Sequence, residues 1–436
     1  MNTPFTRHPL RLRIGWALLI VLILAAAGEL AIRGVGRALS DMQDFSVIYA
    51  STRAFDAGQN PYEASAIRAA WLEATRDRPS PPPPDLALYP PSTYLLLSPL
   101  ALLDWNRVRW AWIGMNLIAV AVLIVALTRY WQGHSPPRRT ALIAAFILGF
   151  GPIHTAMYKG QLAVVVAAVL ALALVAEARQ AAVLAAILIG FAASLKPQIA
   201  APVVFLYLIQ KQWKSIAVVA GVTSGLLGIA WLRLSWAGVS WLGPMLRNVR
   251  LAAAPGGVYD PSPTNPIFYQ LVNTSVLLRR LTSYQPAVTL FLAAVVIVVG
   301  FFLWKRGQYR LDLLADPAAF SAVCVLGLVV ISHRYYDAVV LVFVFVWALK
   351  VGLTGSRHWR RPAALISIAG CLVMAFPLPA LFMTSGLARA PFGIPQILWD
   401  VVVVQHESWV LLVVLVALTS ALAGPPAGEP KRAATP

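Results

Sequence analysis

Residues 40–62 read SDMQDFSVIYASTRAFDAGQNPY, a polar and aromatic segment that directly follows the first strongly apolar stretch of the chain. Ser40 and Gln43 have the spacing of a helix capping box, and Gly58, with a proline three residues later, has that of a helix stop. These signals predict a helix over residues 41–57. Nearly everything after this segment has the composition of membrane spans, so the rest of the chain is organised around it.

The apolar side of the predicted helix consists of Phe45, Ile48, Tyr49, Thr52 and Phe55. We expect this side to lie on the membrane surface while the other side faces water. Asp44 lies in the first turn, where the helix dipole favours a carboxylate, and this position suits a general base at a wet interface. The alternative is that Asp44 is an acidic residue of an amphipathic helix without a chemical role.

The composition is that of a membrane protein. Of the 436 residues, 59% are hydrophobic and 12% are charged, and the mean hydropathy is +0.73. Lys and Arg total 35 against 17 acidic residues, an excess that basic cytoplasmic loops explain better than nucleic-acid binding. Cys324 and Cys371 each lie in an apolar run, which favours packing over a disulfide or a thiol metal site. The chain is therefore predicted to be an all-α polytopic membrane protein without a nucleic-acid partner.

The hydropathy pattern predicts about twelve spans in a single integral membrane domain, residues 1–436. Residues 14–32 are long enough to span and lack a cleavage site, so they are predicted to be an anchor. The other predicted parts are a first outer loop at 33–90, spans two to seven within 108–232, a second outer loop at 233–285, spans eight to twelve within 286–423, and a cytoplasmic tail at 424–436.

The loop charges predict the orientation of these spans. Short loops assigned to the cytoplasm carry clusters of Lys and Arg, whereas short outer loops carry single cations, which is the positive-inside pattern. Both termini are therefore predicted to be cytoplasmic, in an inner (plasma) membrane. Residues 95–103 are too short to span, and we expect a re-entrant or interfacial segment there. The first outer loop is predicted to hold a second helix near residues 64–75 and a polyproline connector at 79–84.

Polar residues collect at the predicted outer ends of the spans. Because a charge at bilayer depth costs about 2.5 to 3.5 kcal/mol, several charges at one level indicate a shared, hydrated, protein-lined cavity. The alternative for any single cation is that it snorkels to the interface. The residues are Asp44, His154, Lys159, Gln161, Lys196, Gln198, His333, Arg334 and Asp337.

Four motifs, in order along the chain, carry a resemblance to a known family. They are the set Asp44, Phe45, Tyr49, Ala54, Gly58, Pro61 and Tyr62, then YPPSTYLLLSPLALL at 89–103, KGQLAVVV at 159–166 and LKPQ at 195–198. With these motifs the chain resembles glycosyltransferase family 87. The resemblance implies a GT-C type fold and a mannosyltransferase-like activity. It implies inverting transfer of a hexose, with mannose as the first candidate, from a polyprenyl-phosphate sugar to an outward-facing lipid or glycan acceptor.

Transfer of a sugar from a lipid phosphate needs one base for the acceptor hydroxyl and cations or other donors for the departing phosphate, but no general acid. Asp44 is the predicted base. Lys196 precedes a proline at a helix start and is the preferred ligand of the donor phosphate, with Gln198 beside it. Lys159 and Gln161 are the next candidates, since the glycine between them allows close backbone approach.

The remaining site predictions concern His333, a metal ion and further contacts to the donor. His333 is either a catalytic residue that hydrogen-bonds the phosphate or relays the proton, or an interfacial histidine with a structural partner. No HxxxH or DxD triplet occurs, so no cofactor is expected, although Asp41 and Asp44 could share a divalent ion. Contacts to the donor phosphate or sugar are also predicted for Arg53, Tyr49, Arg334 and Tyr62.

Two other classes of protein stay open. A transporter or flippase of lipid-linked glycans would place ionisable residues near the midplane of its spans and would use paired broken helices, whereas the charges here are predicted to lie at one face. A noncatalytic membrane scaffold would leave Asp44 dispensable.

Overall fold

The computed structural model describes residues 9–424, apart from residues 77–80, 82, 85, 132–136, 310–311, 355–357, 386–388 and 392. The described residues are helical, and their one β pairing is an isolated bridge between Leu271 and Arg334. The first apolar stretch forms α1 (Pro9–Glu29), which continues without a break as the π-helix η1 (Leu30–Gly36). The first helix therefore extends beyond its predicted end at residue 32.

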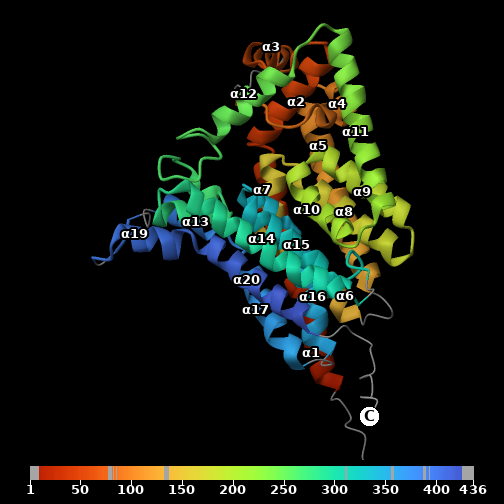
Figure 1. The fold of residues 1–436 in the computed structure, drawn as a ribbon, viewed down its shortest axis with the longest axis vertical. Helices are drawn as coiled ribbons and strands as arrows, with labels where there is room; N and C mark the ends of the chain where they lie inside the picture. Colours follow the sequence, from red (N-terminus) through yellow and green to blue (C-terminus); the bar gives the residue numbers. More distant parts are fainter. Residues whose placement is uncertain are drawn as a thin grey trace, which may run out of the picture.

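Three helices that follow the first one lie at the end of the molecule opposite to the start of α1 (Figure 1), two of them in the predicted first outer loop and the third at the predicted interfacial segment. They are α2 (Gln43–Asp56), α3 (Ala64–Ala74) and α4 (Pro91–Ala101). The helix α3 confirms the helix predicted near residues 64–75. With 11 residues, α4 is too short to cross a membrane, and it packs against α2, α9 and α11. Part of the predicted polyproline connector, residues 79, 80 and 82, lies outside the described residues, as does the predicted tail from residue 425.

Seven helical segments of the described chain are long and apolar enough to cross a membrane: Arg13–Gly36, Trp105–Arg129, Trp213–Trp236, Gln285–Gly307, Tyr335–Leu353, Arg361–Met383 and His406–Ala423. The pair α6 (Pro137–Gly149) and α7 (Gly151–Lys159), bent by 45°, is an eighth candidate. Four shorter apolar helices are α8 (Ala163–Ala178), α9 (Ala182–Leu195), α10 (Pro197–Ile209) and α15 (Pro317–Val330). Each of the twelve predicted spans falls on one of these elements, and twelve crossings stay a prediction.

The other elements are α5 (Trp105–Trp131), α11 (Trp213–Trp236), α12 (Leu242–Ala253), η2 (Phe268–Gln270), α13 (Thr274–Leu281), α14 (Gln285–Gly307), η3 (Tyr335–Val340), α16 (Leu341–Thr354), η4 (His358–Arg360), α17 (Arg361–Val373), α18 (Leu378–Thr384), α19 (Gln396–Trp399), η5 (Asp400–Val404) and α20 (His406–Ala423). Residues 233–285, predicted to be the second outer loop, thus hold α12, η2 and α13.

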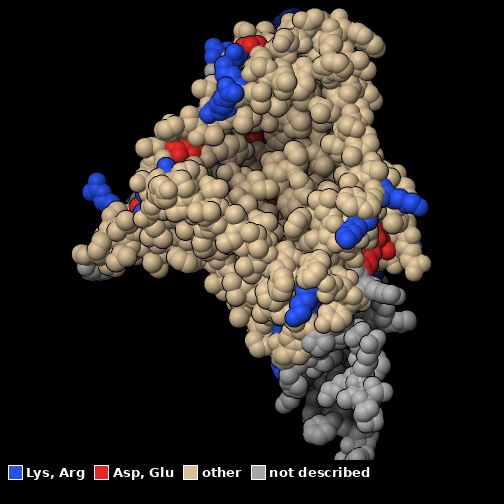
Figure 2. All heavy atoms as spheres, in the orientation of Figure 1, with Lys and Arg blue, Asp and Glu red and all other residues tan. Residues whose placement is uncertain are grey.

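The helices pack in two groups that share one apolar core. One group contains α5, α8, α9 and α11, the other contains α15, α16, α17 and α20, and α10 packs against both α9 and α15. Figure 2 shows a face with few charged side chains, most of them away from its centre, and with a hollow in its upper half, between α12 and the lower helices, in which acidic atoms are visible. Wide uncharged surfaces of this kind are expected of helices that contact lipid.

The helix α2 differs from its prediction in burial and in capping. Its residues from Phe45 to Thr52 are all buried, because α2 packs against α3 and α4, so its apolar side contacts protein and not lipid. The predicted capping box is also wrong. The hydroxyl of Ser40 donates to the carbonyl of Arg37, and the N–H of Gln43 donates to Oδ1 of Asp41 instead.

A left-handed glycine brings α7 against α2. Gly160 ends α7 with a φ of 75°, and a β-carbon at this position would collide with that of Phe45. Only glycine adopts this conformation without strain and leaves room for the contact. The KGQ motif therefore has a packing reason for its glycine, and the contact carries Lys159 and Gln161 to the start of α2.

Candidate active site

Two cavities meet at Asp44. The first has a volume of about 310 Å³ and the second of about 330 Å³, and Asp44, Arg334 and Tyr336 line both. The first, here named the cationic cavity, is also lined by Arg33, Arg37, Gly151, His154, Thr155, Tyr158, Lys159, Tyr269, Gln270, Tyr335, Pro377, Ala380, Leu381 and Glu407. The second, here named the aromatic cavity, is also lined by Gln43, Val47, Ile48, Pro84, Leu86, Ala87, Leu88, Tyr89, Tyr94, Gln161, Val258, Tyr259 and Ile267.

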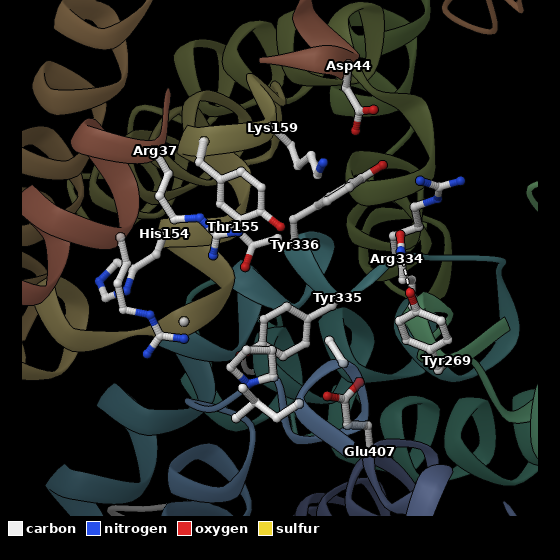
Figure 3. A pocket seen from close by; sticks show the side chains of 17 residues that line it. Arg37, Asp44, His154, Thr155, Lys159, Tyr269, Arg334, Tyr335, Tyr336 and Glu407 are labelled. Carbon is white, nitrogen blue, oxygen red and sulfur yellow. Dashed lines mark hydrogen bonds between the residues drawn. The ribbon is translucent and has the colours of Figure 1, made fainter. Parts of the chain in front are cut away.

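The cationic cavity holds more positive than negative side chains. Its cations are Arg33, Arg37, Lys159 and Arg334, and its two carboxylates are Asp44 and Glu407. Figure 3 shows Arg37 and Arg334 on opposite sides of this cavity, with Asp44 at one end and Glu407 at the other. The cations come from three separate places in the sequence, with Arg33 and Arg37 at the end of the first helix, so only the fold brings them together. Such a cavity favours an anionic ligand.

Gln161 fixes the orientation of Asp44. Its Nε2 donates to Oδ2 of Asp44 at 2.7 Å. Its Oε1 accepts from the hydroxyl of Tyr89 at 2.5 Å and from Nζ of Lys196 at 3.1 Å. Because both of these groups donate, the oxygen end of the amide faces them and the nitrogen end faces Asp44. Within the described part of the chain, Oδ1 of Asp44 has no hydrogen-bond donor. One oxygen of the carboxylate is held, and the other is free to accept a proton from a ligand.

A buried ion pair lies behind Gln161. Lys196, with 2% of its surface exposed, donates from Nζ to Oδ1 of Asp337 at 2.5 Å. Nδ1 of His333 lies 3.0 Å from Oδ2 of the same carboxylate. Nζ of Lys196 also lies 4.8 Å from the ring centre of Tyr336. Neither Lys196 nor His333 lines the cationic or the aromatic cavity. Lys196 contacts Gln161 and Tyr336 directly, and His333 contacts Asp337.

Lys159 reaches the cationic cavity from the end of α7. Its Nζ forms an ion pair with Oδ2 of Asp41 at 2.9 Å, and Asp41 also accepts the N–H of Gln43. The carboxylate of Asp41 is therefore occupied by protein donors on both oxygens. Among the described residues, no group of three or more His, Cys, Asp or Glu side chains could hold a metal ion.

Four predicted ligands line neither cavity. The hydroxyl of Tyr49 donates to the carbonyl of Leu103 at 2.5 Å, and Arg53 donates to the carbonyl of Ala101 at 2.9 Å. The hydroxyl of Tyr62 donates to the carbonyl of Tyr89 at 2.7 Å. These bonds tie α2 and the segment after it to the end of α4 and to the residues on either side of that helix. Gln198 is half-buried in the first turn of α10.

The structure adds residues that the sequence analysis did not select. Arg33 and Arg37 are four residues apart at the end of the first helix, and their i, i+4 spacing was the available signal. They were missed because residue 33 was assigned to a loop. Tyr259 comes from the second outer loop and lies under Arg334, 5.7 Å from its guanidinium carbon. Burial raises the pKa of the Tyr259 phenol to about 12, against the opposing effect of Arg334, so the phenol is neutral. The sequence contained no signal for Tyr259 or Glu407.

Comparison with known proteins assigns the chain to a family. The model of glycosyltransferase family 87 matches residues 87–333, which is more than half of the chain. An alpha-(1->3)-arabinofuranosyltransferase of Corynebacterium glutamicum is 25% identical over 330 residues, covering 71% of this chain and 72% of the relative. No solved structure matches the chain significantly. The matched region contains Gln161, Lys196 and His333, and the cavities lie in a helical protein with several membrane-crossing candidates. The chain therefore belongs to glycosyltransferase family 87 and is a membrane glycosyltransferase.

Proposed function

We propose that the protein transfers one sugar from a polyprenyl-phosphate donor to a lipid or glycan acceptor, with inversion at the anomeric carbon. The donor's sugar phosphate binds in the cationic cavity and the acceptor hydroxyl enters from the aromatic cavity. The observation that carries this proposal is that Asp44 lines both cavities and keeps Oδ1 free of protein donors in the described chain.

The donor phosphate is bound by Arg33, Arg37, Lys159 and Arg334. Arginine presents several N–H groups in a fixed plane that suits phosphate oxygens, and hydrogen bonds between charged groups are stronger than neutral ones. Lys196, the phosphate ligand expected from its helix-start position, takes another role here. Buried and paired with Asp337, it holds Gln161 in the orientation that Asp44 needs.

The reaction is a single displacement. Oδ1 of Asp44 accepts the proton of the acceptor hydroxyl while the hydroxyl oxygen forms a bond to the anomeric carbon. The bond from that carbon to the phosphate oxygen breaks, and the polyprenyl phosphate leaves with the electron pair. The cations of the cavity stabilise the charge that develops on the leaving phosphate. Because phosphate leaves readily, one carboxylate suffices, in contrast to the two that glycosidases use. Attack from the side opposite the phosphate inverts the configuration.

Two sugars are candidates for the donor. Mannose comes from the resemblance of the motifs around Asp44. Arabinofuranose is the second candidate, because the bacterial relative is named as an arabinofuranosyltransferase. Both sugars fit the same chemistry, since the base acts on the acceptor hydroxyl and the cations act on the leaving phosphate, and neither acts on the ring substituents.

The active site is proposed to face the outside of the inner (plasma) membrane, with both termini in the cytoplasm. The basic loops predicted to be cytoplasmic support this orientation. A polyprenyl-phosphate sugar would then present its head group to the cavities from the outer leaflet, where a lipid or glycan acceptor is also available.

The test is an assay with the purified full chain. The protein is incubated with extracted membrane lipids and with polyprenyl-phosphate mannose or polyprenyl-phosphate arabinofuranose, each labelled in the sugar. A new labelled glycan with an inverted linkage supports the proposal. A transporter or flippase would instead move the labelled donor across vesicle membranes without forming a new glycosidic bond, and that result would reject it.

A further inference from the structure

Glu407 is a buried carboxylate of the cationic cavity that the proposed reaction does not use. It lies in the first turn of α20, 2% of its surface is exposed, and it lines the cavity at the end away from Asp44 (Figure 3). Within the described chain its carboxylate has no hydrogen-bond donor and no cationic partner. Glu407 also lies beyond the residues that match the family model, which end at residue 333.

A buried carboxyl group without a hydrogen-bond partner destabilises the fold, because it has lost its hydrogen bonds to water and no protein group replaces them. Two cations of the same cavity are paired elsewhere, Arg33 with Glu29 and Lys159 with Asp41. The protein therefore leaves Glu407 available for a ligand. A ligand that relieves this cost has to bring hydrogen-bond donors of its own.

A second acceptor without a partner belongs to the same cavity. Nε2 of His154 lies 2.7 Å from the carbonyl oxygen of Leu148, and since a carbonyl only accepts, Nε2 carries the proton. In the neutral ring Nδ1 is then an acceptor, and it is buried with no partner in the described chain. Thr155 and Tyr269, which can both donate and accept, line the same cavity.

The unpartnered acceptors on Glu407 and His154 favour a ligand that donates hydrogen bonds. A phosphate accepts hydrogen bonds but does not donate them, so it cannot supply the donors that the oxygens of Glu407 lack. A sugar ring carries neighbouring hydroxyls that both donate and accept, and a carboxylate can take two of them at once. The cavity thus has a cationic part suited to a phosphate and a Glu407 end suited to a polyhydroxylated ring.

We propose that Glu407 binds ring hydroxyls of the donor sugar and so fixes the anomeric carbon relative to Asp44. The inference rests on the proposed function, since it places the sugar phosphate in the cationic cavity. Figure 3 is compatible with this arrangement, because Asp44 and Glu407 lie at the two ends of the space and Arg37 lies to one side. Glu407 then contributes to the choice of sugar, while Arg33, Arg37, Lys159 and Arg334 recognise the phosphate that all donors share.

The experiment compares ligands with and without a sugar. Binding of polyprenyl-phosphate mannose, polyprenyl-phosphate arabinofuranose and sugar-free polyprenyl phosphate is measured on the purified full chain and on Glu407→Ala, Glu407→Gln and Glu177→Gln. Glu177 is a matched control, because it is a glutamate with 7% of its surface exposed that lines neither cavity. Thermal unfolding in detergent checks that each variant is folded.

We expect Glu407→Ala to weaken binding of the sugar-bearing donor about tenfold or more, as loss of a hydrogen bond to a charged group does. Binding of the sugar-free phosphate should stay unchanged or improve. Glu407→Gln, which keeps one acceptor oxygen, should lose less, and Glu177→Gln should bind all ligands as the unmodified protein does.

Equal weakening of both ligand types, or no weakening of either, would overturn the role of Glu407 while leaving the proposed function intact. If the unmodified protein binds and transfers neither sugar, the proposed function itself fails, and the inference fails with it.

Discussion

Nε2 of Gln161 donates a hydrogen bond to Oδ2 of Asp44 at 2.7 Å, across 117 positions of the sequence. The same amide accepts from Lys196, which is paired with Asp337, which in turn contacts His333. The carboxylate at the meeting point of the two cavities is thus oriented by a continuous set of polar contacts. In the proposed function, Asp44 contacts the ligand, whereas Gln161 and Lys196 position Asp44.

Asp44→Asn should abolish sugar transfer. Asparagine has nearly the same size but cannot accept the proton of the acceptor hydroxyl, so turnover should fall by about 10² to 10⁴, with donor binding retained. Steady-state rates with a labelled donor measure this effect. Asp41→Asn is the control, because Asp41 is paired with Lys159 and lines neither cavity. Folded Asp44→Asn protein with a near-normal rate would exclude Asp44 as the base.

Arg37→Gln should weaken use of the donor. Removing a charged donor of hydrogen bonds to phosphate should raise the donor KM roughly 10- to 100-fold, and it should weaken inhibition by sugar-free polyprenyl phosphate to a similar extent. Arg389→Gln is the matched control, since Arg389 is exposed and lines neither cavity. An equal KM for the two variants would show that Arg37 does not bind the phosphate.

Lys196→Met should act mainly through stability. It leaves Asp337 buried without its cation, which costs about 3 to 5 kcal/mol, and thermal unfolding in detergent should report a large loss. Adding Asp337→Asn removes the unpaired charge and should restore most of the stability. If Lys196→Met is fully stable and loses only donor binding, the lysine is a phosphate ligand after all.

Gly160→Ala should disrupt the contact between α7 and α2. The new β-carbon collides with that of Phe45, and alanine is strained at a φ of 75°, so the free energy of unfolding should fall by at least about 1 kcal/mol. Activity should fall as well, because Lys159 and Gln161 would shift. Gly114→Ala is the control, because no atom lies within 4 Å of a β-carbon built there. Equal stability of both variants would remove the packing role of Gly160.

Cysteine labelling should locate the site on the outer side of the membrane. In a cysteine-free background, Gln59→Cys and Thr264→Cys should react with an impermeant reagent on intact cells, since both positions are exposed and lie in the proposed outer loops. Lys305→Cys, in the last turn of α14 at its proposed cytoplasmic end, should react only after permeabilisation. The reverse pattern would place the cavities on the cytoplasmic side.

Much of the fold could be predicted from the sequence because a helix in a membrane is determined by residues that are close together in the chain. Backbone N–H and C=O groups in lipid have to form their hydrogen bonds within their own helix. An apolar stretch of sufficient length is therefore enough to predict a helix. The twelve predicted stretches therefore fall on helices. Local spacing also identified Asp44, the KGQ motif and Arg334, all of which lie at the two cavities or beside them.

Only the tertiary structure decided which polar groups line the two cavities. Lys196 and Lys159 look alike in sequence, each a single cation at a helix end, yet Lys196 is buried against Asp337 and Lys159 reaches the cationic cavity. The apolar side of α2 predicted contact with lipid, but an apolar side chain is buried equally well by lipid or by protein, and here α3 and α4 cover it. Glu407 and Tyr259 had no local signal at all. The physical reason is that burial and pairing depend on contacts between segments far apart in the chain, which no local pattern of residue types records.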